Sequence, residues 1–197
     1  MAKVLVIKAH PYDKSKSSTM KLLHTFLEAY QQQNPHDEIT VVDLYQEKIP
    51  EIDGTLLDAW AAEKLTEEQT KAVQTFNYYT DQFLEHDKII VANPLWNLHV
   101  PARLKMWLDT IAVAQKTFKY TENGPVGLVH GKKALHIQSS GSPFNGKDPA
   151  SQYIQSIFTF IGINDLSHLY IDGKDALTYT NIVNEAHQKA IDLATTF

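Results

Sequence analysis

The sequence predicts an α/β protein built on a doubly wound parallel sheet of five strands. Short apolar runs without strict alternation recur five times, which is typical of strands that are buried on both faces. Segments with the apolar spacing of amphipathic helices lie between these runs. This alternation builds a parallel sheet with helices on both faces, and right-handed connections favour the strand order 2-1-3-4-5.

The five predicted strands are short and rich in β-branched residues. Pro94 breaks the third strand near its end, and the fourth strand runs into a loop of small residues. We expect strands at residues 3–9, 38–44, 87–97, 132–142 and 165–173.

The predicted helices carry recognisable end signals. Thr66 and Gln69 have the spacing of a capping box, Pro101 suits the first turn of a helix, and Gly162 is a typical C-terminal residue. We expect helices at residues 19–34, 66–86, 100–114, 150–162 and 180–195.

Two further segments interrupt the alternation. Residues 45–65 are expected to be irregular and to cross the sheet. Residues 117–131 alternate on both sides of Glu-Asn-Gly-Pro, and Asn-Gly favours the tight turn of a hairpin. The sequence therefore predicts a single domain over residues 1–197 with a β-hairpin insertion near 117–129.

Composition excludes several classes of function. The chain has 197 residues, a net charge of −5 and no cysteine, which argues against a dedicated nucleic-acid binder and excludes thiolate chemistry. Its histidines show no metal-binding spacing, so no metal is expected. We find no apolar run of membrane-spanning length and no signal peptide, and we expect a cytoplasmic protein without a membrane partner.

Ligands of this fold class bind beyond the carboxyl ends of the strands, next to the first strand. Three loops reach that edge, and the first carries Ser17, Ser18 and Thr19 at the start of a helix. Helix N-termini attract anions, and no Gly-rich pyrophosphate or nucleoside-triphosphate motif is present. A terminal monophosphate fits this loop, although helix capping by Ser17 or Ser18 explains the hydroxyl groups equally well.

The second loop follows Pro94 and offers an apolar shelf of Leu95, Trp96 and Leu98, with the Asn97 amide among them. A core cluster beneath the loop is the alternative. The third loop, 139–142, is small and polar, and its glycine lets a ligand approach the backbone, although an ordinary turn would look the same. Together the three loops describe a site for FMN, which combines a flat ring, polar ring edges and a terminal phosphate.

Several segments resemble one known family. "KVLVIKA", "NPLWNL", "FIGI" and above all "FKYTENGPVGL" are similar to the FMN-dependent NADH-azoreductases, also classed as FMN-dependent NADH:quinone oxidoreductases of the flavodoxin-like quinone reductase superfamily. The resemblance runs along nearly the whole chain. It implies a flavodoxin-like homodimer with one FMN per chain near the interface and NADH or NADPH as electron donor. It also implies two-electron reduction of quinones and reductive cleavage of aromatic azo compounds.

The positions that match the family give candidate site residues. We also expect aromatic side chains to line a pocket for the electron acceptor, although Phe160 could instead belong to the core of its helix. The loop at 139–142 departs from the family, because Ser140-Gly141-Ser142 replaces Arg-Gly-Gly and a later His is absent. The departures leave substrate range and contacts to the pyrimidine edge of the ring open. The candidates are His10, Ser17, Ser18 and Thr19 for the phosphate, Pro94, Leu95, Trp96, Asn97, Leu98, Ser139, Ser140, Gly141 and Ser142 for the ring, and Phe118, Tyr120, Phe144 and Phe160 for the acceptor.

Hydride transfer through flavin N5 by a ping-pong mechanism needs no catalytic side chain, and none is assigned. An FAD-dependent quinone reductase and a flavodoxin-type electron carrier are the alternatives. Helix 100–114 predicts assembly, since Val100, Met106 and Val113 are expected to lie outside its core-facing stripe of Leu104, Trp107, Leu108 and Ile111. An apolar surface of this kind needs cover, which a two-fold homodimer would provide.

Overall fold

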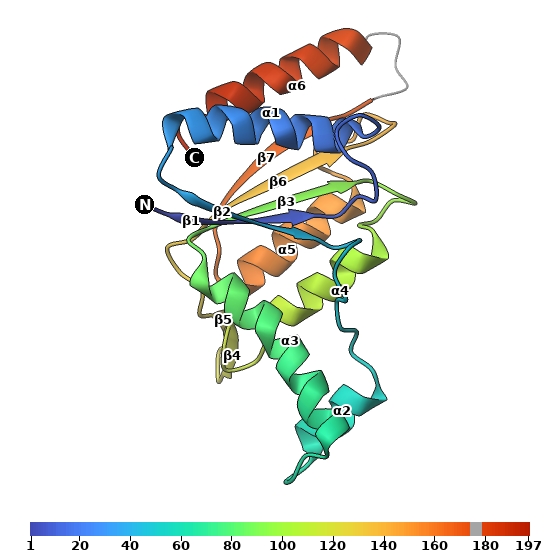
Figure 1. Cartoon of the computed structure of the whole chain (residues 1–197), viewed down its shortest axis with the longest axis vertical. Helices are drawn as coiled ribbons and strands as arrows, with labels where there is room; N and C mark the ends of the chain where they lie inside the picture. Colours follow the sequence, from blue (N-terminus) through green and yellow to red (C-terminus); the bar gives the residue numbers. More distant parts are fainter. Residues whose placement is uncertain (174–178) are drawn as a thin grey trace.

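The protein is described by a computed structural model that covers residues 1–173 and 179–197. Its centre is a five-stranded sheet in the order β2-β1-β3-β6-β7, and each neighbouring pair is parallel (Figure 1). Because β4 and β5 form a separate hairpin, β6 and β7 are the fourth and fifth strands of the sheet. The predicted strand order 2-1-3-4-5 is therefore confirmed. The strands are β1 (Lys3–Lys8), β2 (Glu38–Asp43), β3 (Lys88–Pro94), β6 (Lys133–Ser139) and β7 (Asp165–Ile171).

Two helical layers cover the sheet, with α1 and α6 on one face and α3, α4 and α5 on the other (Figure 1). Successive side chains of β1 enter different cores: Leu5 packs under α3–α5, whereas Val4 and Val6 pack under α1 and α6. A strand buried on both faces needs continuous apolar residues, which is why "VLVI" does not alternate. The helices are α1 (Ser18–Gln33), α2 (Gly54–Ala61), α3 (Glu67–Glu85), α4 (Ala102–Ile111), α5 (Pro149–Ile161) and α6 (Tyr179–Ala194).

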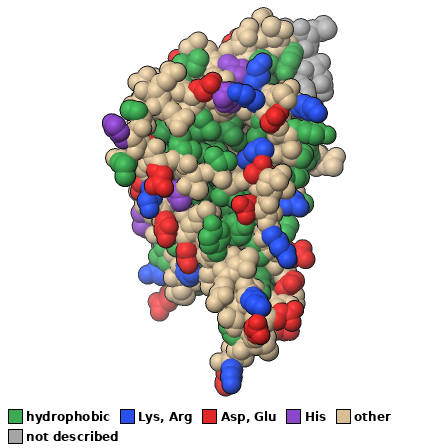
Figure 2. All heavy atoms as spheres, in the orientation of Figure 1, with side chains coloured by type: hydrophobic (Ala, Val, Ile, Leu, Met, Phe, Trp, Pro, Cys, Tyr) green, Lys and Arg blue, Asp and Glu red, His purple; other side chains and the backbone are tan. Residues whose placement is uncertain are grey.

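Helix α2 corrects the prediction that residues 45–65 are irregular. Asp53 caps it by accepting a hydrogen bond from the Leu56 N–H at 2.9 Å, and Leu56 is buried. Trp60 packs edge-on against Phe76 of α3, with ring centroids 5.3 Å apart. This helix and the start of α3 extend away from the sheet (Figure 1), and charged side chains cover much of the visible face of this extension (Figure 2).

The hairpin prediction is confirmed by β4 (Phe118–Thr121) and β5 (Gly124–Gly127), which pair antiparallel. Gly124 takes the positive φ of 104° that closes the turn. Gly127 lies so close to the end of α5 that a Cβ there would be 2.3 Å from the Gly162 N atom. This contact fixes the hairpin at the end of the molecule where the sheet strands begin (Figure 1).

Helix α4 is shorter than the predicted 100–114, but its core-facing stripe is confirmed. The four predicted side chains, from Leu104 to Ile111, are all fully buried. The expectation that Val100 lies outside the core is wrong, because this residue precedes the helix and packs into the same cluster at 6% exposure. Met106 and Val113 are half-buried.

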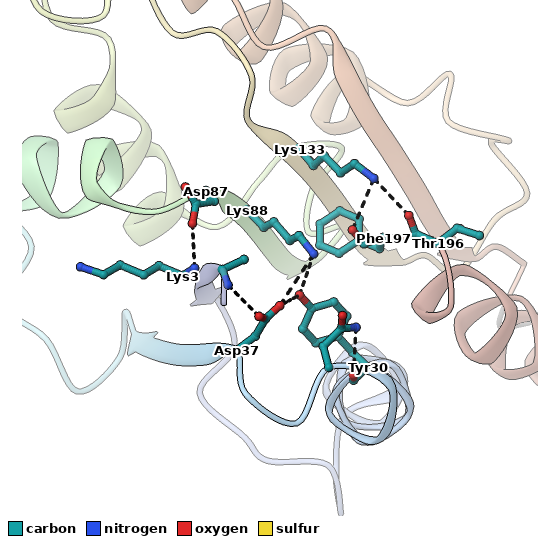
Figure 3. A network of polar contacts seen from close by, with 10 residues as sticks. Lys3, Tyr30, Asp37, Asp87, Lys88, Lys133, Thr196 and Phe197 are labelled. Atoms are coloured by element: carbon teal, nitrogen blue, oxygen red, sulfur yellow. Dashed lines mark hydrogen bonds and ion pairs between the residues drawn. The ribbon is translucent and has the colours of Figure 1, made fainter.

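A polar network ties together the edge where the strands begin, here called the amino edge (Figure 3). The Asp37 carboxylate accepts hydrogen bonds from the Tyr30 hydroxyl and the Ala2 N–H, both at 2.6 Å, and the Lys88 ammonium donates to the Tyr30 hydroxyl at 2.7 Å. These groups satisfy one another at the amino edge. The network also includes the Lys3 N–H bonded to Asp87 and the Lys133 ammonium bonded to the carbonyls of Thr196 and Phe197.

Within the described part of the chain, no helix is both long and apolar enough to cross a membrane.

Candidate functional site

The three predicted loops converge on a cleft of about 260 Å³ at the opposite edge of the sheet, here called the carboxyl edge. Figure 1 shows these loops at the ends of β1, β3 and β6. Parallel strands end at a common edge, which brings together loops that are far apart in the sequence. The cleft is lined by His10, Lys16, Ser17, Ser18, Pro94, Leu95, Trp96, Ser139, Ser140 and Gly141.

The first loop delivers the N-terminus of α1 to this cleft. Ser17 is the N-cap residue, and its hydroxyl accepts a hydrogen bond from the Met20 N–H at 3.3 Å. The Ser18 hydroxyl lies 3.1 Å from the Tyr179 hydroxyl. Both serines also line the cleft, so capping and ligand contact are compatible. First-turn N–H groups have no intrahelical acceptor, which makes this helix end suited to an anion.

Thr19, predicted as a phosphate contact, does not line the cleft. Its side chain is fully buried, and its hydroxyl lies 2.6 Å from the Ser139 hydroxyl at the end of β6. The contact joins the start of α1 to the neighbouring loop. The structure therefore places Thr19 behind the cleft, where it supports both walls.

The second loop contains a tight turn with unusual backbone angles. Trp96 and His99 exchange two backbone hydrogen bonds, of 3.1 and 3.0 Å. Between them Asn97 has φ 50° and Leu98 has φ 64°, so two successive residues are left-handed, as in a type I′ turn. Leucine rarely adopts this conformation, and strain of this kind gathers at functional sites. Asn97 and Leu98 are exposed beside the cleft rather than part of its lining.

His10 and Trp96 connect the first two loops. Their rings lie 5.4 Å apart, and the His10 Nδ1 atom accepts a hydrogen bond from the Tyr12 N–H at 3.0 Å. Lys16 enters the same cleft, with its ammonium 5.4 Å from the centre of the Tyr12 ring. Lys16 is not among the site residues predicted from the sequence, although a lysine between hydroxyl residues after the first strand is a signal for an anion.

The third loop is held by Ser140, the residue that follows β6. Ser140 is 3% exposed, its N–H donates to the Ile171 carbonyl at 2.9 Å, and its hydroxyl lies 2.8 Å from the Asp172 carboxylate. Gly141 is exposed and lines the cleft, whereas Ser142 lies outside it. Asp172 is not among the predicted site residues, since it lies one residue past the last strand and far from this loop in the sequence.

A buried polar network lies under the second and third loops. The Asn93 amide donates to the carbonyl of Pro94 and to the Gln138 side chain, both at 3.1 Å, so its oxygen accepts from His136 Nε2 at 2.9 Å. Burial lowers the pKa of His136 to about 3, with a smaller contribution from nearby His168, which keeps the ring neutral. His136 Nδ1 has no hydrogen-bond partner among the described residues.

The same network continues to the start of α5. The Gln138 amide donates to the Asp148 carboxylate and to the Ser151 hydroxyl, both at 3.1 Å. Burial raises the pKa of Asp148, but hydrogen bonds from Ser151 and Gln138 outweigh it and leave that pKa below its usual value. Asp148 is thus a buried carboxylate that caps α5 and fixes the end of β6.

The aromatic residues expected around the acceptor fall into two groups. Phe144 is half-buried in the third loop, whereas Phe118 contacts Phe160 and Tyr120 with ring centroids 4.5 and 5.4 Å apart. Phe118 and Tyr120 line an apolar cavity of about 390 Å³ that also involves Trp60 of α2. This cavity lies past the C-terminal end of α4, while the cleft lies before its start, and ten helical residues span about 15 Å. Within one chain the two regions are separate.

The sheet, the helix N-terminus and the aromatic shelf define a flavin- or nucleotide-binding protein of the doubly wound class. Residues 2–193 match the family described as having a flavodoxin-like fold. The FMN-dependent NADH:quinone oxidoreductase of Streptococcus suis is 47% identical over 89% of each chain. That of Geobacillus kaustophilus is 40% identical over 100% of each chain.

Solved structures agree with these relatives. Azoreductase from Bacillus anthracis str. Sterne has a TM-score of 0.95 at 32% identity, with both chains covered completely. An FMN-dependent NADH-azoreductase from Bacillus anthracis str. Ames Ancestor, solved in complex with FMN, has a TM-score of 0.94 at 32% identity over 100% of this chain and 99% of the other. The chain belongs to the flavodoxin-like family that includes these FMN-dependent NADH:quinone oxidoreductases and azoreductases.

Proposed function

We propose that this protein is an FMN-dependent NAD(P)H oxidoreductase that reduces quinones by two electrons and reductively cleaves aromatic azo compounds to amines. The observation that carries the proposal is the cleft at the carboxyl edge, where a helix N-terminus, two serines and a lysine lie beside an aromatic shelf. The names of the curated relatives and of the FMN-bound azoreductase support the same assignment.

The donor set of the cleft fits a phosphate dianion. Ser17 and Ser18 offer hydroxyl groups, Lys16 offers a positive charge, and the first turn of α1 offers backbone N–H groups. Hydrogen bonds between charged and polar partners are among the stronger ones in proteins. The cleft offers one anion-binding position and no Gly-rich turn, which favours FMN over FAD. The pyrophosphate of FAD would need a turn whose backbone it can approach closely.

The other side of the cleft fits the flavin ring. Leu95 and Trp96 would carry its face, and the exposed Gly141 allows the backbone of the third loop to approach its polar edge. Bound FMN supplies the hydride acceptor and donor, N5. The role of the chain is to hold the ring and to aim N–H donors at the edge that becomes more negative on reduction.

A ring that rests on a shelf exposes one face. NADH or NADPH and the acceptor would then occupy the same space in turn, which is the basis of the proposed ping-pong order. Initial-rate plots at several fixed acceptor concentrations should be parallel, and intersecting lines without dead-end inhibition would contradict a shared site.

We further propose a homodimer that completes the acceptor pocket. Met106 and Val113 leave apolar surface on and just past α4, and the cluster of Phe118, Tyr120 and Phe160 lies at the far end of that helix from the cleft. If two copies pack with antiparallel α4 helices, the two-fold axis brings the partner's aromatic cluster toward the cleft. Phe144 would line the same pocket from within the chain.

The identity of the cofactor is the direct test. The purified protein should be yellow and should release FMN on denaturation, and anaerobic NADH alone should bleach it. A protein that releases only FAD supports the FAD-dependent alternative. A flavin that NADH does not reduce supports an electron carrier.

Assembly is tested by light scattering at low micromolar concentration. We expect a dimeric mass for the wild type and for Gln188→Asp on exposed α6, but a monomer with little activity for Met106→Asp. A monomeric wild type with full NADH–quinone turnover would refute the dimer. The cytoplasmic location remains a prediction, which cell fractionation would test.

A further inference from the structure

Asp172 lies just past the end of β7 and holds the third loop at two points, where the loop is now taken to extend from residue 139 to Asn145. One carboxylate oxygen lies 2.8 Å from the Ser140 hydroxyl, and the other accepts the Asn145 N–H at 2.7 Å. Both ends of the segment from Ser140 to Asn145 are therefore hydrogen-bonded to the Asp172 side chain. A single carboxylate closes a loop of six residues.

The loop has two other hydrogen bonds of its own: the Ser140 hydroxyl also lies 2.6 Å from the Ser142 carbonyl, and the Lys147 N–H donates to the Phe144 carbonyl at 3.0 Å. Neither of these bonds ties the loop to the sheet, which the Asp172 contacts do.

The middle residues of the loop, 141–143, are exposed and belong to no helix or strand. Asn145 and Gly146 both have positive φ, 52° and 71°, so the chain reverses where the second contact is made. A non-glycine residue with positive φ is uncommon and needs surrounding contacts to hold it. The bond from the Asn145 N–H to Asp172 is such a contact.

We propose that Asp172 is a positioning residue that holds the third loop in its flavin-binding conformation. The inference rests on the proposed function, because Ser140 and Gly141 line the cleft that would hold the flavin ring. Asp172 itself lines a different hollow, of about 490 Å³, together with Pro143 and Asn145. It therefore acts through Ser140 rather than by touching the ring.

The physical basis is preorganisation. A free loop loses conformational entropy when it closes on a ligand, and a loop that is already fixed does not. With Asp172 in place, the backbone N–H groups of Gly141 and Ser142 are positioned before the cofactor arrives. Without it, ordering of the loop would oppose binding, and affinity for the cofactor would fall.

Asp172→Asn is the informative change, because asparagine keeps the shape but turns one acceptor oxygen into a donor that faces Ser140 or Asn145. We expect FMN to bind the apoprotein about tenfold more weakly by fluorescence titration, the effect of about one hydrogen bond. Asp165→Asn is the matched control on the exposed start of the same strand, and we expect it to bind FMN normally. Ser140→Ala tests the same contact from the loop. The double variant with Asp172→Asn should bind no more weakly than the weaker single variant.

Two further readouts separate positioning from general damage. In the apoprotein, Asp172→Asn should accelerate amide hydrogen exchange at Asn145 by more than the loss of global unfolding free energy accounts for, and excess FMN should restore turnover of the loaded enzyme. Wild-type FMN affinity in Asp172→Asn, or unchanged exchange at Asn145, would overturn the proposal. If the wild type itself binds no FMN, the proposed function fails instead, and the exchange measurement still decides whether Asp172 holds the loop.

Discussion

The two edges of the sheet differ in how many of their polar side chains are hydrogen-bonded within the protein. At the amino edge, Asp37, Tyr30 and Lys88 bond to one another, and the side chains of Asp37 and Lys88 are only 11% and 16% exposed. At the carboxyl edge, Ser17 makes one long capping bond of 3.3 Å, and Lys16 is exposed beside it. At the carboxyl edge some polar groups also bond one another, such as Thr19 with Ser139 and Ser140 with Asp172. The exposed Lys16 and the first turn of α1 nevertheless face the cleft, where the proposed function places the phosphate.

The backbone shows the same difference. The amino edge is reinforced by the contacts in Figure 3, which join the first strand, the turn before β2 and the last residues of the chain. Of the non-glycine residues with positive φ in the described part of the chain, Asn97, Leu98 and Asn145 lie in loops of the carboxyl edge, and Gln115 follows α4. Strained backbone persists only where its surroundings fix it. We therefore expect substitutions at the two edges to change different properties.

The largest expected effect is on stability at the amino edge. Asp37→Asn removes a charged acceptor of two hydrogen bonds, and we expect the free energy of unfolding to fall by about 2 kcal/mol. Urea unfolding measures the change. FMN affinity should remain that of the wild type. A loss of affinity comparable to the loss of stability would show that the two edges are coupled, and the comparison would fail.

The second effect concerns pH and the network under the cleft. His136 titrates near 6.5 in the unfolded chain but at about 3 in the folded protein, so between these values the unfolded state binds more protons. Stability contributed by neutral His136 is therefore present above pH 6.5 and is lost as pH falls, by about 1.4 kcal/mol per pH unit. Between pH 7 and pH 5 this amounts to about 2 kcal/mol.

His136→Gln should remove this pH dependence. We expect the loss of unfolding free energy between pH 7 and pH 5 to be smaller in this variant than in the wild type, whatever its stability at pH 7. His130→Gln is the control, since His130 is exposed. Equal pH profiles for the wild type and His136→Gln would mean that other groups, such as Asp148 and His168 beside the ring, dominate the acid response.

The smallest effect compares two helix caps. Thr66 and Gln69 form a reciprocal capping box at the start of α3, far from the cleft, whereas Ser17 caps α1 inside it. Thr66→Ala should cost about 1 kcal/mol of stability and leave FMN affinity unchanged. Ser17→Ala should cost a similar or smaller amount of stability but weaken FMN binding about tenfold or more.

Urea unfolding and fluorescence titration of both variants make the comparison. If Ser17→Ala behaves like Thr66→Ala in both measurements, the hydroxyl group at residue 17 is a helix cap alone. The anion would then be held by Lys16 and the backbone of α1.

The sheet and the cleft could be predicted from the sequence because they depend on local patterns. Apolar runs mark strands, and the strand-end rule brings their loops together whatever the side chains are. Helix α2 was missed, since eight residues with only Leu56 and Ala59 buried give too little periodicity. Val100 was placed wrongly because a helical stripe was extended to a residue that is not in the helix.

The polar network was missed for a different reason. Three of its residues lie within strands, and nothing in the sequence around them indicates which partners they bind. They are Asn93 in β3 and His136 and Gln138 in β6. Their partners are set by the register of β3 and β6, which pairs Asn93 with Gln138. The contact between Asp172 and Ser140 likewise becomes apparent only when β7 is placed beside β6. Contacts between strands distant in sequence carry this information, and a single sequence does not display them.

Leu98 carries a consequence for how such a protein evolves. It is 56% exposed and left-handed, so glycine there would relieve backbone strain and expose no core. Selection for stability alone would thus favour its replacement. If a ligand bound in the neighbouring cleft extends as far as Leu98, as the proposed function allows, selection for binding would favour keeping it. A population propagated without demand for the cofactor should drift toward glycine or asparagine at this codon, and one grown under that demand should not.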